Sequence, residues 1–158
     1  ILDSLFTLKN IEKVMQKQSE LSKLNVRTLD QFMAHIFAGA YEQAMPLCEE
    51  KVKFVVFRDD SDKQVPIYGT HIGRLEGIEF FKNLAQMFEF GDFIIEESII
   101  TDSYIVRFGR LSHTVARTGK VFNSLWAMIV RFNDAGEICL YRMHEDTAAL
   151  ETAMQLTR

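Results

Sequence analysis

Three ionisable side chains in the second half of the chain could carry proton-transfer chemistry: His113, Glu145 and Asp146. The ordinary pKa of histidine, near about 6.5, suits it to give or take a proton at neutral pH. Glu145 and Asp146 closely follow an apolar segment. A carboxyl group at the rim of an apolar cavity has a raised pKa, because desolvation disfavours its charged form. These three residues are therefore the candidate catalytic groups.

A predicted β-hairpin positions the two carboxyl groups. Two apolar runs, at 121–132 and 137–143, flank a turn at 133–136 with the sequence NDAG. Apolar runs separated by a short turn that contains Asp and Gly are typical of a hairpin. We expect Phe132 to pair with Glu137 across this turn.

The predicted pairing gathers aromatic and thioether side chains on one face of the hairpin. It places Met128 opposite Tyr141 and Trp126 opposite Met143. Because strand side chains alternate, these residues share a face that ends at Glu145. Such a face would line a ligand cavity, and it would equally well line a plain core. A slip of one residue in the register would move Glu145 to solvent.

Asp146 and His113 also have purely structural interpretations. Asp146 precedes a predicted helix, where a carboxylate caps free backbone N–H groups and meets the positive end of the helix dipole. His113 pairs across the turn at 117–120 with Ser124, and it is either a base or a satisfied core histidine. His71 falls in a predicted loop that either closes the mouth of a cavity or lies at the surface. His35 either faces inward or packs against the N-terminal helix.

Length and composition place the chain among single-domain globular proteins. It has 158 residues, of which 47% are hydrophobic and 25% are charged. Its net charge of −4 argues against a nucleic-acid partner, which would need clustered Lys and Arg. The longest apolar runs are shorter than the roughly 18 residues of a membrane-spanning helix, so no membrane association is expected.

The sequence gives no sign of a metal or cofactor site. Cys48 and Cys139 have neither metal-ligand spacing nor the pattern of a disulfide framework, and no Gly-rich loop follows a predicted strand. We therefore expect no metal and no cofactor. A reducing, cytoplasmic location is the default, although the chain begins at Ile1 and a targeting segment upstream of it would not be visible.

Hydrophobic periodicity predicts helices in the first part of the chain and a sheet in the later part. The expected elements are helices at 10–24 and from a cap at 28–30, a short helix at Pro46, a strand at 51–57, a helix from Gly73 to about 88, strands at 93–101 and 103–116, the hairpin, and a terminal helix from Asp146. This order predicts an α+β fold with a mostly antiparallel sheet.

Several short motifs occur in an order and spacing that characterise one superfamily. They are FMAHIFAGAYEQA at 32–44 followed by a Val/Phe strand, Gly73-Arg74 with Ile78 and Phe81, Thr118-Gly119-Lys120, RFNDAGEI at 131–138, and DTAAL at 146–150. This pattern resembles the nuclear-transport-factor-2-like (NTF2-like) superfamily, to which the SnoaL-like polyketide cyclases and the ketosteroid isomerases belong. The resemblance implies a cone-shaped, strongly curved, mostly antiparallel sheet that N-terminal helices close around a pocket. We expect an N-terminal helical extension at 1–27 and a SnoaL-like cone domain at 28–158.

The resemblance does not carry over the mechanism of the ketosteroid isomerases. Aligned with them, Phe32 stands at the position of a tyrosine, Met128 at the oxyanion-site aspartic acid, and Val55 or Val56 at the base. None of these side chains can give or take a proton, whereas the isomerase mechanism needs a neutral carboxylic acid.

Two other members of the superfamily resemble the chain in part. An epoxide hydrolase of this fold uses an Asp-Arg-Asp relay, for which Asp146 and Arg110 are present but Ser112 stands in place of the other carboxylate. The SnoaL-like cyclases are more similar, because their proposed acid/base is an aspartate just before the terminal helix. Asp146 occupies that place, with His113 as its possible partner.

We therefore predict a small-molecule pocket protein of the SnoaL-like type. It would act as an acid/base isomerase, cyclase or hydrolase on an apolar carbonyl or polyketide-like substrate. The alternatives are a non-catalytic binder of an apolar ligand and a homo-oligomerising association domain. The residues expected to contact the ligand are Phe32, Tyr68, Trp126, Met128, Tyr141 and Met143.

The other face of the predicted hairpin is apolar as well. An antiparallel strand with one face in water should alternate apolar and polar residues, and this one does not. A contiguous apolar patch marks an interface, and a twofold homodimer is the commonest closed assembly. The alternative cover is the N-terminal helix at 10–24. The patch comprises Leu125, Ala127, Ile129, Ile138 and Leu140, with Arg131 and Arg142 at its ends.

Overall fold

The computed structural model of the protein describes residues 2–156, with side chains described from residue 20 onward. The elements are α1 (Leu2–Phe37), α2 (Tyr41–Ala44), the 3-10 turn η1 (Met45–Leu47), β1 (Cys48–Val56), β2 (Thr70–Ile72), α3 (Arg74–Met87), β3 (Phe88–Glu89), β4 (Phe93–Ile100), β5 (Tyr104–Val115), β6 (Val121–Phe132), β7 (Ile138–His144) and α4 (Thr147–Met154). None of the described helices is long and apolar enough to cross a membrane.

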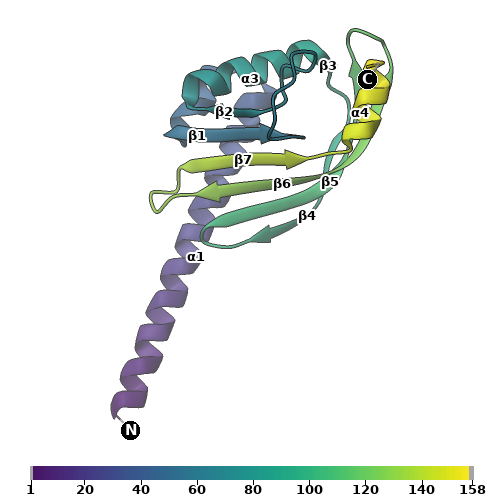
Figure 1. Cartoon of the computed structure of the whole chain (residues 1–158). Coiled ribbons are helices and arrows are strands. Elements are labelled where there is room, and N and C mark those ends of the chain that lie inside the picture. Colours follow the sequence, from purple (N-terminus) through teal and green to yellow (C-terminus); the bar gives the residue numbers. More distant parts are fainter. Residues whose placement is uncertain (1, 157–158) are drawn as a thin grey trace.

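The strands form one strongly curved sheet with helices on its inner face (Figure 1). The strand order is β2-β1-β7-β6-β5-β3, and β4 pairs with β5 along the same edge as β3. Only the β1–β7 pair is parallel among the described strands, and the others are antiparallel. In Figure 1, α1 runs behind the sheet and α3 lies along β1 and β2. The predicted α+β class, with a curved and mostly antiparallel sheet, is confirmed.

The core is an aromatic cluster between α1, β1, α3 and β7. The helices reach the sheet closely because of Gly77 on α3, where a Cβ atom would lie 2.3 Å from the Phe54 ring. The rings of the cluster lie 4.9–6.4 Å from their neighbours, and each is at most 3% exposed. The cluster consists of Phe32, Phe54, Phe80, Phe81 and Tyr141.

The N-terminal part of the chain is a single helix, which corrects the prediction of a new helix capped at 28–30. α1 continues through this segment because the residues around it are fixed by tertiary contacts. Leu29 is fully buried, and the Asp30 carboxylate accepts a 2.6 Å hydrogen bond from Arg107 on β5. One turn earlier, the Asn25 amide donates to the Asp102 carbonyl oxygen at 2.7 Å. Packing against the sheet therefore overrides the local capping signal.

The hairpin of β6 and β7 forms, but its register differs from the predicted one by two residues. Met128 pairs with Met143 rather than with Tyr141, and Tyr141 pairs with Val130. A shift of two residues keeps the side chains of the regularly paired residues, up to Arg131 and from Leu140 onward, on their predicted faces, since strand side chains alternate with a period of two. The face that holds Trp126, Met128, Tyr141 and Met143 is therefore the inner one.

The turn chemistry of Asn133 explains the shift. Its side-chain oxygen accepts hydrogen bonds from the backbone N–H groups of Ala135 and Glu137, at 3.0 and 2.9 Å. This draws Glu137 into the turn, so that Phe132 pairs with Ile138 and a bulge follows Arg131. Ile138 is fully buried as a result, which removes it from the predicted outer patch.

Candidate functional site

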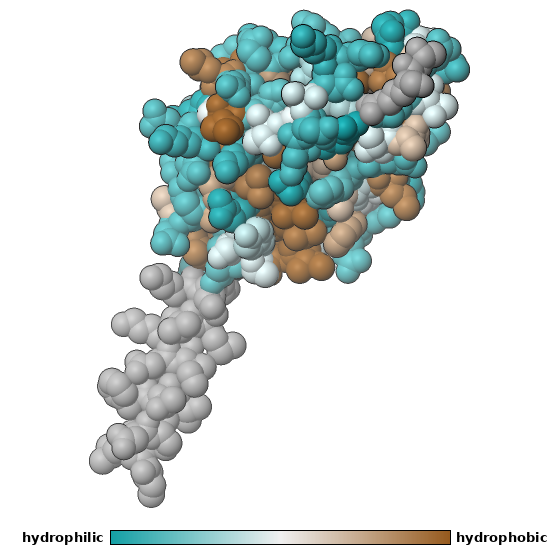
Figure 2. All heavy atoms as spheres, in the orientation of Figure 1, coloured by the Kyte–Doolittle hydropathy of each residue, from teal (hydrophilic) through white to brown (hydrophobic). Residues whose placement is uncertain are grey.

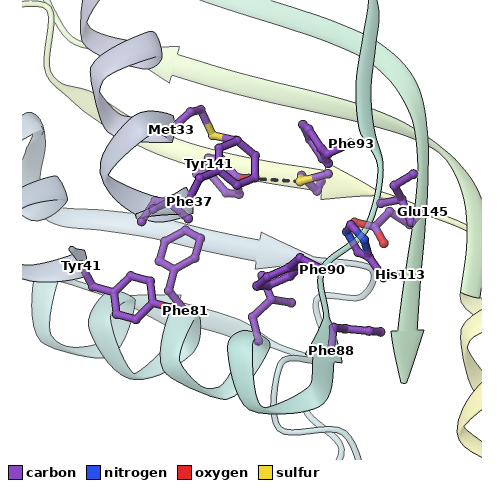
Figure 3. A pocket seen from close by; sticks show the side chains of 14 residues that line it. Met33, Phe37, Tyr41, Phe81, Phe88, Phe90, Phe93, His113, Tyr141 and Glu145 are labelled. Atoms are coloured by element: carbon purple, nitrogen blue, oxygen red, sulfur yellow. Dashed lines mark hydrogen bonds between the residues drawn. The ribbon is translucent and has the colours of Figure 1, made fainter. Parts of the chain in front are cut away.

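A small cavity lies inside the cone, between the end of α1, α2, the end of α3, the β3–β4 connection, and the inner faces of β5 and β7 (Figure 3). Its volume of about 60 Å³ holds a few water molecules. Ligand pockets of solved proteins are larger, at about 300–1,000 Å³. The lining residues are Met33, Ile36, Phe37, Tyr41, Phe81, Leu84, Phe88, Phe90, Phe93, Leu111, His113, Tyr141, Met143 and Glu145.

Aromatic side chains at the mouth keep the cavity small. Phe37, at the end of α1, is 59% exposed, and Phe90, between β3 and β4, is 50% exposed. The Phe37 ring packs edge-on against Phe93 at 5.5 Å, and the Phe90 ring packs edge-on against His113 at 5.2 Å. Because both rings are partly in solvent, their displacement would enlarge the cavity without exposing much of the core.

Glu145 is the polar group that most needs explanation in this apolar cavity. It follows the last residue of β7 and is fixed there, because the next backbone N–H, that of Asp146, donates to the Ser124 hydroxyl at 2.8 Å. Burial raises the pKa of Glu145 to about 8. None of the described residues forms a hydrogen bond with its carboxyl group. A buried carboxyl group without a hydrogen-bond partner can transfer a proton, and it can also form a hydrogen bond with a ligand.

His113, on the inner face of β5, lies at the same end of the cavity as Glu145 (Figure 3). Burial lowers its pKa, so the ring is neutral at pH 7. The backbone N–H of Gly91 donates to His113 Nδ1 at 3.2 Å, and the Ser112 carbonyl oxygen lies 3.0 Å from the same nitrogen. A neutral imidazole carries one proton, so an Nδ1 that accepts from Gly91 leaves that proton on Nε2.

Tyr141, on β7, supplies a further polar group. Its hydroxyl donates to the Met143 sulfur at 3.1 Å, the dashed contact in Figure 3. Burial raises the pKa of Tyr141, and the nearby Glu145 raises it further, so the phenol stays protonated. A thioether is a weak acceptor, and the carbonyl oxygen of a ligand would replace it favourably.

At neutral pH the cavity therefore contains polar groups but little charge. The Tyr141 phenol and the His113 imidazole are neutral, and Glu145 is largely protonated because its pKa lies above 7. All three can donate a hydrogen bond, and none of the residues that line the cavity is Lys or Arg. An uncharged ligand with an oxygen acceptor fits this arrangement, whereas a carboxylate or phosphate has no cation to pair with.

The predicted catalytic residues divide into two groups. His113 and Glu145 line the cavity together. Asp146 does not line it, because its carboxylate caps α4 by accepting the Ala149 backbone N–H at 2.9 Å, with the side chain at the surface. The geometry of Asp146 therefore matches the helix-capping interpretation.

The predicted ligand contacts divide in the same way. Tyr141 and Met143 line the cavity. The other four pack into the core instead, which corrects their expected position on the cavity surface. Phe32 and Met128 are fully buried in the core cluster, Trp126 stacks on Phe93 at 4.5 Å, and Tyr68 packs against Phe57 at 5.7 Å and donates to Glu151 at 3.4 Å.

The remaining histidines lie outside the cavity lining. His71 is not in a loop at the mouth: it belongs to strand β2, pairs with Phe54 of β1 and packs on Phe80 at 5.0 Å. His35 lies in the last turn of α1, next to the cavity-lining Ile36.

Sequence reasoning missed the aromatic walls of the cavity. Phe37 lies in the motif at 32–44, Phe88 ends the predicted helix and Phe93 begins the predicted strand, while Phe90 falls between these two elements. The available signal was three phenylalanines around Gly91, a composition that can place rings close to a backbone turn. No cluster of metal-ligating side chains occurs among the described residues.

Comparisons with known proteins agree with this architecture. The sequence matches no protein-family model, and no curated protein matches it. Among solved structures, an NTF2-like protein from Burkholderia xenovorans LB400 superposes with a TM-score of 0.73 at 19% identity, covering 83% of this chain and 95% of that one. A proposed SnoaL-like polyketide cyclase from Jannaschia sp. CCS1 gives 0.67 at 15% identity, covering 86% and 94%.

A third similar structure is that of TerC, co-crystallised with polyporic acid. It has a TM-score of 0.71 and 17% identity, and the match covers 84% of this chain and 99% of TerC. The chain therefore has the NTF2-like fold, as its motifs predicted. At these identities the likeness establishes the fold, and the chemistry must be argued from the cavity.

Proposed function

We propose that this protein binds a small, uncharged, largely apolar carbonyl compound in the cavity and transfers a proton at the carbon next to the carbonyl group. The observation that supports this most directly is Glu145, an unpaired carboxyl group with a pKa of about 8 in an aromatic cavity. TerC, a protein with a similar structure, was co-crystallised with a small organic molecule, polyporic acid.

The residues of the cavity divide the proposed reaction between them. Ionised Glu145 takes a proton from the carbon next to the carbonyl. The electron pair of that C–H bond forms a carbon–carbon double bond, and the π pair of the carbonyl group moves to its oxygen, which gives an enolate. The Tyr141 hydroxyl and His113 Nε2–H donate to that oxygen as its negative charge develops. Protonated Glu145 then returns the proton to carbon. At pH 7 roughly one molecule in ten has Glu145 ionised, and its raised pKa makes it a stronger base than an ordinary carboxylate.

Binding can be tested with three small probes of similar shape: acetophenone, ethylbenzene and benzoate, titrated by calorimetry at pH 6.5. We expect acetophenone to bind about tenfold more tightly than ethylbenzene, because only the ketone accepts hydrogen bonds. Benzoate should not bind. Equal binding of acetophenone and ethylbenzene would show that the cavity binds apolar groups without recognising the carbonyl. If neither compound binds, the cavity is part of the hydrophobic core and not a ligand site.

Catalysis is tested separately from binding, because the alternative is a non-catalytic binder. Exchange of the acetophenone methyl protons for deuterium in D₂O, followed by NMR, reports proton removal next to the carbonyl. We expect Glu145→Gln to slow the protein-catalysed exchange by about 100-fold or more. The exposed Glu97→Gln is the matched control and should not change it. Tight binding of acetophenone without deuterium exchange would favour the alternative of a non-catalytic binding protein.

We also propose that the outer face of the sheet pairs with a second copy of the chain. Figure 2 shows hydrophobic side chains gathered over β4, β5 and β6 on this face. Ile99 is 51% exposed, Phe108 38% and Leu125 76%. In Figure 1 the first half of α1 extends away from the sheet. A patch of this kind usually marks an interface.

Light scattering tests this second proposal. The wild-type protein should run as a dimer at micromolar concentration, and Ile99→Glu with Leu125→Glu should give a folded monomer. Leu75→Glu, at a residue that is 81% exposed on α3, is the control and should leave the dimer intact. A monomeric wild type would contradict the proposal.

A further inference from the structure

We propose that the segment Phe90-Gly91-Asp92 is the gate of the cavity and also the element that holds His113 as a hydrogen-bond donor. One hydrogen bond, from the Gly91 backbone N–H to the side-chain Nδ1 of His113, links the two functions because it exists only while the segment lies against β5. In this arrangement Gly91 is a positioning residue that acts through His113. The ligand chemistry rests on the proposed function, whereas the gate and the histidine tautomer are inferred from the contacts of His113 with Gly91 and Ser112.

The segment is built to cover His113. It connects β3 to β4, and the Phe90 ring stands edge-on against the imidazole at 5.2 Å and an interplanar angle of 80°. On the other side of Gly91, the Asp92 carbonyl oxygen accepts the Ser112 backbone N–H at 2.9 Å. With Phe90 half exposed, the ring lies between the cavity and solvent, next to the histidine that it covers.

Gly91 must be a glycine for the segment to close. A Cβ atom there would lie 2.3 Å from the Ser112 carbonyl oxygen, which is far inside any real contact. The obstacle is backbone and cannot rotate away as the end of a side chain could. Any other residue therefore pushes the segment off β5 and lengthens the hydrogen bond from Gly91 to His113.

The position of the gate selects the tautomer of His113. With the gate closed, Nδ1 lies between the Gly91 N–H at 3.2 Å and the Ser112 carbonyl oxygen at 3.0 Å, and we infer that it accepts from Gly91, which leaves the ring proton on Nε2. When Gly91 moves away, the remaining partner of Nδ1 is the Ser112 carbonyl oxygen at 3.0 Å, which can only accept. The proton then moves to Nδ1, and Nε2 becomes an acceptor.

This selection determines what the cavity can bind. With the gate closed, Nε2–H is a donor without a partner among the described residues, and it serves the carbonyl oxygen of a ligand. With the gate open, the lone pair on Nε2 would repel that same oxygen. A ligand must displace Phe90 to enter the small cavity, and it is held by His113 only after the segment has closed again. Closure of the gate and recognition of the carbonyl oxygen by His113 are therefore coupled.

The tautomer can be measured without any ligand, by long-range ¹H–¹⁵N NMR of the histidine rings at a pH where they are neutral. The spectrum of His113→Asn assigns the His113 signals. We expect the Nε2–H pattern for His113 in the wild type and the Nδ1–H pattern in Gly91→Ala. The other histidines, His35, His71 and His144, serve as internal controls and should not change.

Phe90→Leu is the matched variant, because it alters the gate while keeping the hydrogen bond of Gly91. It should retain the Nε2–H tautomer and bind acetophenone with a faster association rate, whereas Gly91→Ala should weaken acetophenone binding by about tenfold. An Nδ1–H tautomer in the wild type overturns the inference even if Gly91→Ala does not fold. An unchanged tautomer in a folded Gly91→Ala overturns it as well. Failure of acetophenone to bind, with both tautomers as expected, overturns the proposed function instead.

Discussion

The interior of this protein contains two neighbouring regions made of the same residue types but organised differently. Around Phe32 and Phe54, aromatic rings from helices and sheet fill the space completely, and every member is almost fully buried. Around Phe90 and Phe93, rings line a space instead of filling it, and the polar groups that reach it lack strong partners. Phe81 and Tyr141 belong to both regions. A site in this fold is thus distinguished by incomplete packing rather than by unusual composition.

The largest effect that this comparison predicts concerns phenylalanine truncation. Phe32→Ala removes a fully buried ring that contacts three other rings, and should cost about 3–5 kcal/mol of unfolding free energy. Phe90→Ala removes a half-exposed ring and should cost about 1 kcal/mol or less. Urea denaturation of both variants tests this. Similar losses would mean that the cavity wall is ordinary core.

The next effect concerns Glu145 and has the opposite sign. Because the folded-state pKa is raised to about 8 from an ordinary 4.5, the folded protein retains a proton that the unfolded chain has lost between those pH values. The wild type therefore loses stability as pH rises from about 4.5 to 8. Glu145→Gln cannot ionise, so it should be more stable than the wild type by about 1–3 kcal/mol at pH 8, and the difference should shrink towards pH 4.5.

Thermal melts across this pH range measure the difference. The exposed Glu97→Gln should show no such pH-dependent gain. A Glu145→Gln variant that is less stable than the wild type at pH 8 would show that the carboxylate has a stabilising partner in the folded protein, and would remove the basis for its proton-transfer role.

The sequence was sufficient for features that depend on periodicity and order. The alternation of residues in the hairpin correctly placed Met128 and Tyr141 on the inner face, even though the register was wrong by two residues. Side-chain parity is insensitive to such a shift, whereas pairing depends on the Asn133 turn, whose hydrogen bonds are not visible in a hydrophobic pattern.

Features that depend on tertiary packing could not be predicted from the sequence. The cap signal at 28–30 is real locally, but burial of Leu29 and the ion pair of Asp30 with Arg107 keep the helix continuous. Likewise, the type of residue does not say whether a ring fills space or borders it. That is why Trp126 was expected on the cavity surface, although it lies behind Phe93.

The smallest predicted effect separates two adjacent carboxyl groups. Glu145 lines the cavity, whereas Asp146 accepts the Ala149 N–H and caps α4. Asp146→Ala should therefore cost about 1 kcal/mol, while Asp146→Asn, which keeps an acceptor at the cap, should be nearly neutral. Neither should slow deuterium exchange into acetophenone, because the Asp146 side chain lies at the surface and the Ser124 contact that fixes Glu145 uses only the Asp146 backbone. Melts and exchange rates measured on the same samples decide the matter. A 100-fold loss of exchange in a stable Asp146→Asn variant would assign the acid/base role to Asp146, and Glu145 would then be an uncharged part of the cavity wall.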